Sequence, residues 1–318
     1  MSAFARLRFP AQWAAVAFAL TVTAWPPAFT DAPPPQSVQT PAGPAAIPLS
    51  MPNKAGSLKF GVLGDFGTGE PQQYEMAAQI ARVHQQFKFN LMLLVGDNLY
   101  GSERPQDYQQ KFEIPYKPLL DAGVEFRAAL GNHDSREQRK YPKFNMNSEY
   151  YYSFKAPSES VRFIALESTY PTLKQIVWLE KQLKESNEDW KIVYFHHSLY
   201  CSAGRHGSDV QLRDKLEPLF VAYNVSVVFT GHDHVYERTK PQKDIVYFVA
   251  GSGGKVAPGD LDRRSQITAK GFDAEQAFLI AEITQDEMAF NAVSRTGKVI
   301  DSGKLTRRHI NKPAPSSR

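Results

Sequence analysis

Cysteine is nearly absent from this sequence, because Cys201 is the single cysteine among 318 residues. One thiol cannot form an internal disulfide, so the fold has to be held by its hydrophobic core and by any bound ions. We expect Cys201 to be a loop residue and not a catalytic thiol, since groups with more suitable chemistry surround it.

A strong charge of one sign is also missing. Lysine and arginine together number 37 and aspartate and glutamate 33, which leaves a net charge of +4. No long basic run accompanies this small excess, so we expect no nucleic-acid partner. The apolar fraction of 42% and the charged fraction of 22% are ordinary for a globular protein long enough to bury a core.

The N-terminal apolar stretch is shorter than the roughly 20 residues that span a bilayer. It extends from about Trp13 to Trp25, follows Arg6 and Arg8, and ends before two prolines. This pattern predicts a signal peptide within residues 1–25, and hence export to the periplasm or to the outside of the cell. An uncleaved N-terminal membrane anchor is the alternative.

The rest of the chain divides into three parts. Residues 26–56 are rich in proline and alanine and carry almost no charge, which predicts an extended linker. We expect one folded domain over residues 57–305 and a C-terminal tail over residues 306–318.

Strands and helices alternate along most of the predicted domain, and strands alone follow at its end. The predicted strands are Leu58–Leu63, Leu91–Val95, Glu125–Leu130, Tyr150–Phe154, Val161–Glu167, Lys191–Phe195, Val225–Thr230, Ile245–Ala250, Ala277–Ile283, Glu287–Val293 and Val299–Gly303. The predicted helices are Pro71–Phe87, Leu173–Ser186 and Asp209–Tyr223. This order predicts an α/β domain with a mixed sheet system whose edge is completed by antiparallel strands.

Five short blocks with metal-ligand chemistry dominate the sequence, and most of them come where a predicted strand ends. They are Gly64-Asp65-Phe66-Gly67, Gly96-Asp97-Asn98-Leu99-Tyr100, Gly131-Asn132-His133-Asp134, Val193-Tyr194-Phe195-His196-His197 and Gly231-His232-Asp233-His234. In α/β sheets, ligands bind at the carboxyl ends of the strands. Five strands placed side by side would therefore bring carboxylates, imidazoles, an amide and a phenol together.

This set of side chains predicts two metal ions. Asp65 and Asp97 would repel each other in a partly dry cleft unless a cation compensates their charge. Several imidazoles at the same place indicate a transition metal and not calcium. More ligands are available than one ion can use, so we expect a two-metal site with Asp97 as the bridging carboxylate.

Glycines precede the ligand-type residues in four of the blocks. Gly64, Gly96, Gly131 and Gly231 share this position. A residue without Cβ permits a sharp turn and a close approach to an ion, so we expect these glycines to make room for the site.

Together the blocks resemble the motifs of the calcineurin-like metallophosphoesterases. Tyr100, three residues after Asp97, makes the chain similar to the purple acid phosphatase branch of that superfamily. The folded part begins almost at the first block, as in the small, single-domain members. The resemblance implies an α/β (α+β) fold, a four-layer sandwich of two stacked mixed β-sheets flanked by helices.

The resemblance also implies a role for each block. The first ion, expected to be Fe(3+), would be held by Asp65, Asp97, Tyr100 and His234. The second ion, Fe(2+), Zn(2+) or Mn(2+), would be held by Asp97, Asn132, His196 and His232. The catalytic residues His133 and His206 would contact the phosphate or the leaving group outside the metal shell.

One position departs from the family pattern, because Ser198 stands where many relatives carry proline. His196 is the expected ligand, since it comes three residues after Val193. His197 is the alternative ligand.

The implied activity is that of an acid phosphatase, namely hydrolysis of phosphate monoesters by a metal-bound hydroxide. A phosphodiesterase or nucleotide pyrophosphatase on the same site is one alternative, and a non-catalytic binding module of the same fold is another. The expected partner is a small phosphorylated substrate. We expect contact with a membrane only through an uncleaved N-terminal segment.

Overall fold

A computed structural model describes residues 46–308 of the chain. The predicted signal peptide, the first twenty residues of the predicted linker (26–45) and residues 309–318 of the predicted tail lie outside the described residues. Within the described part, no helix is long and apolar enough to cross a membrane.

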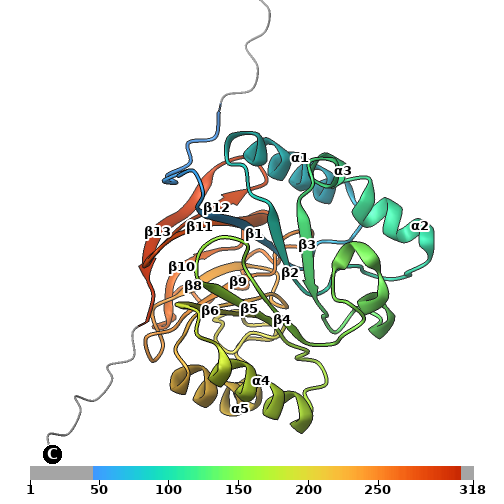
Figure 1. Cartoon of the computed structure of the whole chain (residues 1–318). Coiled ribbons are helices and arrows are strands. Elements are labelled where there is room, and N and C mark those ends of the chain that lie inside the picture. The colour runs from blue at the N-terminus through green and yellow to red at the C-terminus, as the bar shows by residue number, and fades with distance from the viewer. Residues whose placement is uncertain (1–45, 309–318) are drawn as a thin grey trace, which may run out of the picture. The chain divides into compact units, whose positions relative to one another are not determined.

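Two β-sheets lie face to face in the middle of the molecule (Figure 1). The first sheet has the strand order β13-β12-β11-β1-β2-β3. Its strands are β1 (Leu58–Leu63), β2 (Leu91–Val95), β3 (Glu125–Ala129), β11 (Ala277–Thr284), β12 (Glu287–Ser294) and β13 (Val299–Thr306). Strands β1, β2 and β3 are parallel, and the antiparallel strands β11 to β13 complete the sheet.

The second sheet has the strand order β10-β8-β9-β7-β6-β5-β4. Its strands are β4 (Tyr152–Lys155), β5 (Val161–Ala165), β6 (Trp190–Tyr194), β7 (Val225–Thr230), β8 (Tyr236–Thr239), β9 (Val246–Ala250) and β10 (Thr268–Phe272). Strands β5, β6, β7 and β9 are parallel, and antiparallel strands flank them on both sides. Like β2, strands β6, β7 and β9 are buried at every residue, as expected for strands covered on both faces.

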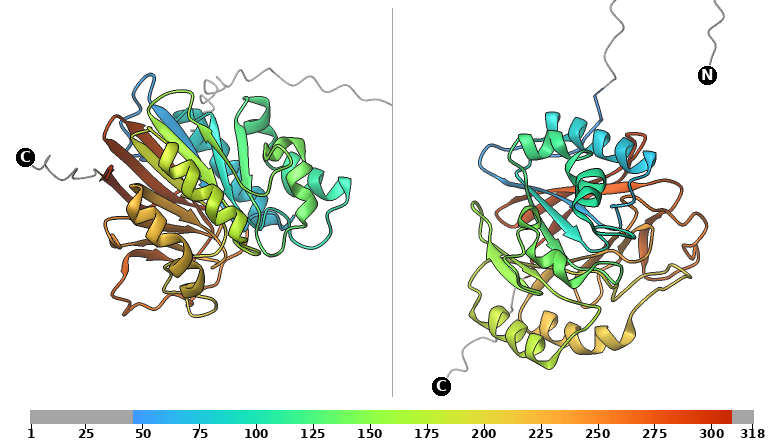
Figure 2. Two further views of the ribbon diagram at one scale, coloured as in Figure 1. Left: turned by 60° about the horizontal axis from the view of Figure 1, so that its bottom comes forward. Right: turned by 90° about the vertical axis from the view of Figure 1, so that its right-hand side faces the viewer.

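Helices form the two outer layers (Figures 1 and 2). The helix α1 (Pro71–Gln86), with α3 (Lys117–Asp121), lies over the first sheet, and α4 (Leu173–Glu185) and α5 (Val210–Ala222) lie over the second. Short helices follow β2 and β3 in the chain: α2 (Pro105–Tyr108), the π-helix η1 (Gln109–Glu113), and the 3-10 helices η2 (Arg136–Lys140) and η3 (Pro142–Phe144).

Aromatic side chains fill the space between the sheets. The ring of Phe60 on β1 lies edge-on to Phe163 on β5 and Phe229 on β7, with centroid distances of 5.3 and 6.1 Å. Phe248 on β9 meets Phe290 on β12 in the same way at 5.1 Å. These contacts fix how the two sheets stack. The predicted four-layer α/β sandwich is confirmed.

The strands of the site belong to two sheets and not to one row. The prediction of five adjacent strands is wrong in this respect, because β1, β2 and β3 lie in the first sheet and β6 and β7 in the second. Strands β8 and β10 were not predicted. Charged residues interrupt β8, and β10 is a partly exposed edge strand with a glycine, so neither shows an apolar period.

Residues 46–56, the described part of the predicted linker, lie against the first sheet. The backbone N–H groups of Asn53 and Lys54 donate to the two carboxylate oxygens of Glu282 on β11, both at 2.6 Å. Ser50 N–H donates to the side chain of Asn291 on β12 at 2.7 Å. The buried Glu282 carboxylate thus accepts bonds from the chain that leads into β1.

A polar contact also ties the sheets together. Asp301 on β13 accepts a hydrogen bond from the Tyr236 hydroxyl at 2.8 Å and two from the guanidinium of Arg238, at 2.8 and 3.2 Å. Tyr236 and Arg238 lie on β8 of the second sheet, and Asp301 is only 9% exposed. One carboxylate therefore satisfies a cation and a hydroxyl from the facing layer.

We expect the substitution Asp301→Ala to lower the free energy of unfolding by about 2–4 kcal/mol, because it leaves a mostly buried guanidinium and a buried hydroxyl without their acceptor. Asp286→Ala is the matched control, since Asp286 pairs with Arg307 at the surface and should cost less than about 1 kcal/mol. Urea unfolding of both variants measures the difference. Equal losses would contradict the role assigned to Asp301.

Candidate metal centre

The predicted site residues converge where the carboxyl ends of the two sets of parallel strands meet. Asp65 follows β1, Asp97 follows β2 and His196 follows β6. Each offers a ligand atom within 4.8 Å of the others, and all three side chains are buried. Both sheets therefore contribute donors to one cluster.

Three of the donor residues have left-handed backbone conformations. The φ angles are 55° at Asp65, 50° at Asp97 and 71° at His232. Such angles are uncommon outside glycine and concentrate at functional sites. The chain turns sharply at each of these residues immediately after a strand, which directs the side chain into the cluster.

The glycines beside the donors leave room for side chains from other strands. A Cβ at Gly231 would collide with Asp65 Oδ2, and one at Gly131 would collide with Asp97. A Cβ at Gly96 would lie 2.6 Å from Nδ1 of His196. Gly96, Gly131 and Gly231 thus leave room for donor side chains, as expected.

One half of the cluster is built around Asp65. The Tyr100 hydroxyl donates to Asp65 Oδ1 at 3.1 Å and lies 3.2 Å from Nε2 of His234. His234 Nε2 is itself 3.6 Å from Asp65 Oδ1. The other carboxylate oxygen, Oδ2, accepts the backbone N–H of His232 at 3.0 Å. Asp65 therefore keeps one oxygen directed at the phenol and the imidazole.

The other half is built around His196. Its Nε2 lies 3.0 Å from Asn132 Oδ1, 3.2 Å from His232 Nδ1 and 3.4 Å from Asp97 Oδ1. Its Nδ1 lies 3.0 Å from the carbonyl oxygen of Val95, which can only accept a hydrogen bond. Nδ1 therefore carries the proton of a neutral ring, and Nε2 presents a lone pair to the other donors.

The charges of the site point to a bound cation. Burial, together with the neighbouring Asp97, raises the pKa of Asp65 well above its usual range. Burial lowers the pKa of His196 strongly and, with the neighbouring His196, lowers the pKa of His232 to about 2. Burial, with Lys255 next in importance, lowers the pKa of His234 to about 4. These imidazoles are neutral near pH 7, so they bring ligand lone pairs and no compensating charge.

The donor set fits metal ions. His196 Nε2 faces an amide oxygen and a carboxylate oxygen with no proton available between them, and a cation would satisfy all three lone pairs. Burial, with Asp65 and Asp97, raises the pKa of the Tyr100 phenol. Ionisation of that phenol therefore requires a positive charge in the site. Oxygen and imidazole donors from two adjoining groups match the chemistry of transition-metal centres.

The two predicted catalytic histidines lie at the exposed rim. The ring of His133 is 5.1 Å from that of Tyr100, and its backbone N–H donates to Asp97 Oδ1 at 2.9 Å. The ring of His206 lies 4.1 Å from that of His232. The structure thus brings all nine predicted site residues together.

The alternative ligand His197 lies beside the donor cluster. Its Nδ1 is 2.9 Å from the hydroxyl of Ser168, and its ring is 4.4 Å from His232. The unusual Ser198 is buried, and its hydroxyl donates to the carbonyl of Gly231 at 3.0 Å. The geometry therefore favours His196 as the ligand at this strand end.

Asp134, the last residue of the third block, caps the loop that carries Asp97 and Tyr100. Its carboxylate accepts five hydrogen bonds, from the backbone N–H groups of Asn98, Leu99 and Gly131 and from the side chains of Asn98 and Gln138. Burial and the nearby Asp97 raise the pKa of Asp134 to about 8, whereas the five donors favour its ionised form. No sequence pattern pointed to Gln138, which lies on η2.

Cys201 lies in a loop, as predicted. Its thiol is buried, and burial raises its pKa well above the usual range, which opposes a nucleophilic role.

Asp233, between two predicted ligands, accepts the backbone N–H of Gly207 at 3.1 Å. This bond connects the loop of Cys201 and His206 to the donor cluster.

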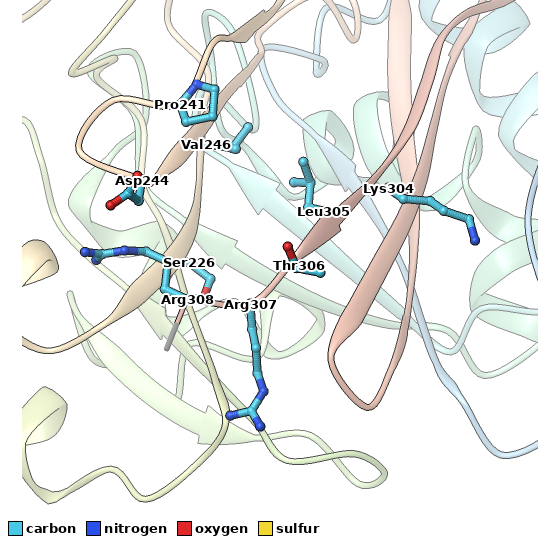
Figure 3. A pocket seen from close by; sticks show the side chains of 9 residues that line it. All are labelled: Ser226, Pro241, Asp244, Val246, Lys304, Leu305, Thr306, Arg307 and Arg308. Carbon is cyan, nitrogen blue, oxygen red and sulfur yellow. The ribbon is translucent and has the colours of Figure 1, made fainter. Parts of the chain in front are cut away.

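A separate hollow of about 390 Å³ lies at the opposite ends of the parallel strands (Figure 3). Its lining includes Ser226 at the start of β7, and Arg307 and Arg308 after β13. Arg307 pairs with Asp189 and Asp286, and Arg308 donates to two backbone carbonyls. These cations are already satisfied, and the hollow contains none of the donors described above.

The fold and the set of metal-ligand side chains define a metal-dependent hydrolase of the two-sheet α/β sandwich class. The sequence model of the calcineurin-like phosphoesterase family matches residues 58–236, so the chain belongs to this family. It is a phosphoesterase, and its purple acid phosphatase relatives imply a dinuclear metal site.

Relatives in both plants and animals support this assignment. The chain is 27% identical to purple acid phosphatase 4 of Arabidopsis thaliana over 273 residues, which cover 75% of this chain and 80% of the relative. It is 26% identical to tartrate-resistant acid phosphatase type 5 of Homo sapiens over 302 residues, covering 79% and 92%. The predicted resemblance to the purple acid phosphatases is confirmed.

Solved structures share the fold. A purple acid phosphatase from yellow lupin (Lupinus luteus) seeds aligns with a TM-score of 0.66 at 18% identity, covering 81% of this chain and 55% of that one. GAP50, described as the anchor in the inner membrane complex of Plasmodium, aligns with a TM-score of 0.68 at 20% identity, covering 80% and 90%.

We expect Gly231→Ala to reduce metal content strongly, because the added methyl group would enter the space of Asp65 Oδ2. Gly204→Ala is the control: its Cβ would meet Asp260 at an ordinary contact distance of 3.5 Å, and metal content should be retained. Elemental analysis gives the metal content, and circular dichroism shows whether each variant is folded. A folded Gly231→Ala protein with full metal occupancy would refute the packing argument.

Proposed function

We propose that this protein hydrolyses phosphate monoesters at a dinuclear metal centre. One ion would be held by Asp65, Asp97, Tyr100 and His234, and the other by Asp97, Asn132, His196 and His232. The observation that carries the proposal is the cluster of lone pairs around His196 Nε2, at 3.0 to 3.4 Å from donors of Asn132, His232 and Asp97. The similarity to purple acid phosphatases supports a dinuclear centre.

Bound ions would supply Lewis acidity, which lowers the pKa of water and neutralises the charge of a phosphate group. The protein's own residues hold and orient the substrate. His133 and His206 are exposed at the rim, with the ring of His133 beside Tyr100 and the ring of His206 beside His232. We assign them to phosphate binding and to protonation of the leaving alkoxide.

We assign Fe(3+) to the first position, because a phenolate is a suitable ligand for a trivalent ion. Fe(2+), Zn(2+) or Mn(2+) would fill the second position, whose donors are imidazole, amide and carboxylate.

We also propose that the protein is exported, on the basis of the N-terminal sequence pattern, which lies outside the described residues.

The proposal predicts that the purified protein hydrolyses p-nitrophenyl phosphate faster than bis(p-nitrophenyl) phosphate. Asp97→Ala should lose both metals together and more than about 100-fold in activity, because even residues outside the metal shell cost 10- to 100-fold. Asp121→Ala, which changes an exposed carboxylate paired with Lys117, should retain both metals and activity. Parallel assays and elemental analysis test this. Full activity in the Asp97→Ala protein would disprove the bridging role.

Tyr100→Phe should remove the visible absorption of the iron-loaded protein, because it deletes the only phenol among the assigned ligands. The aromatic ring, and with it the packing against His133, is retained in the variant. Absorption spectra of both proteins at matched iron content provide the measurement. A colourless wild-type protein containing zinc or manganese alone would refute the assignment of iron but not the hydrolysis.

A further inference from the structure

Two basic residues at the rim of the metal centre have no acidic partner within residues 46–308. Lys255 follows the glycine-rich turn after β9, and its ammonium nitrogen lies 3.3 Å from the ring centroid of Tyr100. Arg205 is exposed and directly precedes His206. In the described part of the chain, neither side chain forms an ion pair or donates a hydrogen bond. Other arginines of the same region are paired, such as Arg238 with Asp301 and Arg263 with Asp273.

The loops that carry these cations lie side by side. Ala203 and Leu261 form an antiparallel bridge, and Gly204 N–H donates to the carbonyl of Asp260 at 2.8 Å. The 201–208 loop with Arg205 is therefore held against the 255–261 loop with Lys255. Both cations consequently belong to one side of the rim.

The loop of Lys255 lies beside residues assigned to the first ion. Lys255 N–H donates to the Asp65 carbonyl at 3.2 Å, and Ala257 N–H donates to the His234 carbonyl at 2.9 Å. The loop of Lys255 is thus bonded to two segments that carry assigned ligands. Its ammonium group is held over the face of Tyr100, one of the ligands assigned to the first ion.

A cation that lies over an aromatic face and forms no ion pair within residues 46–308 can donate hydrogen bonds to an anion at little cost. The reacting phosphate already has His133 and His206 assigned to it. We propose that Lys255 and Arg205 form a subsite for a second anionic group of the substrate, so that condensed phosphates, in which the leaving group is itself a phosphate, are preferred. This inference rests on the proposed function.

The reaction balances with water as the only co-reactant. A water oxygen forms a bond to one phosphorus atom, and the bridging P–O bond breaks. The electron pair of that bond leaves with the second phosphate, whose increased negative charge the two cations face. The proton released by the water passes to solvent, and two phosphates are formed from one diphosphate.

The test is the ratio of kcat/KM for inorganic diphosphate to kcat/KM for p-nitrophenyl phosphate, whose leaving group is a single aryl oxygen. In Lys255→Gln and in Arg205→Gln this ratio should fall about tenfold, as expected when one charge-assisted hydrogen bond is lost. Lys255→Arg keeps the charge and should retain most of the preference. Raising the salt concentration should lower the wild-type ratio, because exposed charges are screened.

Lys270→Gln is the matched control, since Lys270 on β10 is exposed and forms no ion pair with any residue the structure describes. It should leave the ratio unchanged. If the wild-type protein hydrolyses both substrates and neither glutamine variant changes the ratio, the subsite is refuted while the proposed function stands. If the metal-loaded wild-type protein hydrolyses neither substrate, the proposed function is wrong and the subsite falls with it.

A binding measurement gives a second readout that does not depend on turnover. Calorimetric titration of the metal-loaded protein with methylenediphosphonate and with methylphosphonate compares two anionic groups with one. The two glutamine variants should bind methylenediphosphonate about tenfold more weakly, relative to methylphosphonate, than the wild-type protein does. Metal content is measured before and after each titration, because diphosphonates chelate ions. An unchanged affinity ratio at constant metal content would overturn the inference.

Discussion

The site depends on lone pairs that face one another with no proton between them. Val95 accepts the one proton of the neutral His196 ring, and this leaves Nε2 directed at an amide oxygen and a carboxylate oxygen. Such an arrangement is repulsive in a buried place unless a cation occupies the centre of the group. The buried carboxylates of Asp65 and Asp97 add to the same requirement. The metal therefore completes the electrostatics of the cluster as well as its chemistry.

The protein assembles this cluster by stacking two sheets whose parallel strands end at the same place. The first sheet supplies both carboxylates, the phenol and the amide, whereas the second supplies the imidazoles. Sharp turns after the strands, with positive φ angles at Asp65, Asp97 and His232, bring the side chains inward. Glycines on the neighbouring loops keep the space free. Asp134 then holds the loop between Asp97 and Tyr100 through bonds to its backbone.

Much of this could be predicted from the sequence, because both the core strands and the ligands leave strong local signals. The strands Leu58–Leu63, Leu91–Val95 and Val225–Thr230 were predicted with the boundaries that the structure has. Asp65, Asp97, Asn132, His196 and His232 were found because ligand-type residues follow such strands directly, and the family resemblance added the other four candidates.

The partition of the strands between two sheets could not be predicted from residues alone, since an apolar run shows that a strand is buried but not which strand is its neighbour. The resemblance to a known family supplied that information. Gln138 and Lys255 were also beyond reach. Their roles come from contacts with residues distant in the sequence, and nothing in their own surroundings along the chain distinguishes them from ordinary polar residues.

The bond from His196 to the carbonyl of Val95 crosses from the second sheet to the first. The separation of the layers is maintained by buried rings such as Phe60 and Phe163. Evolutionary drift in those rings would therefore shift the imidazole of His196 relative to the carboxylate of Asp97. Selection for turnover should accordingly restrain the hydrophobic interior of this enzyme as firmly as selection for folding does.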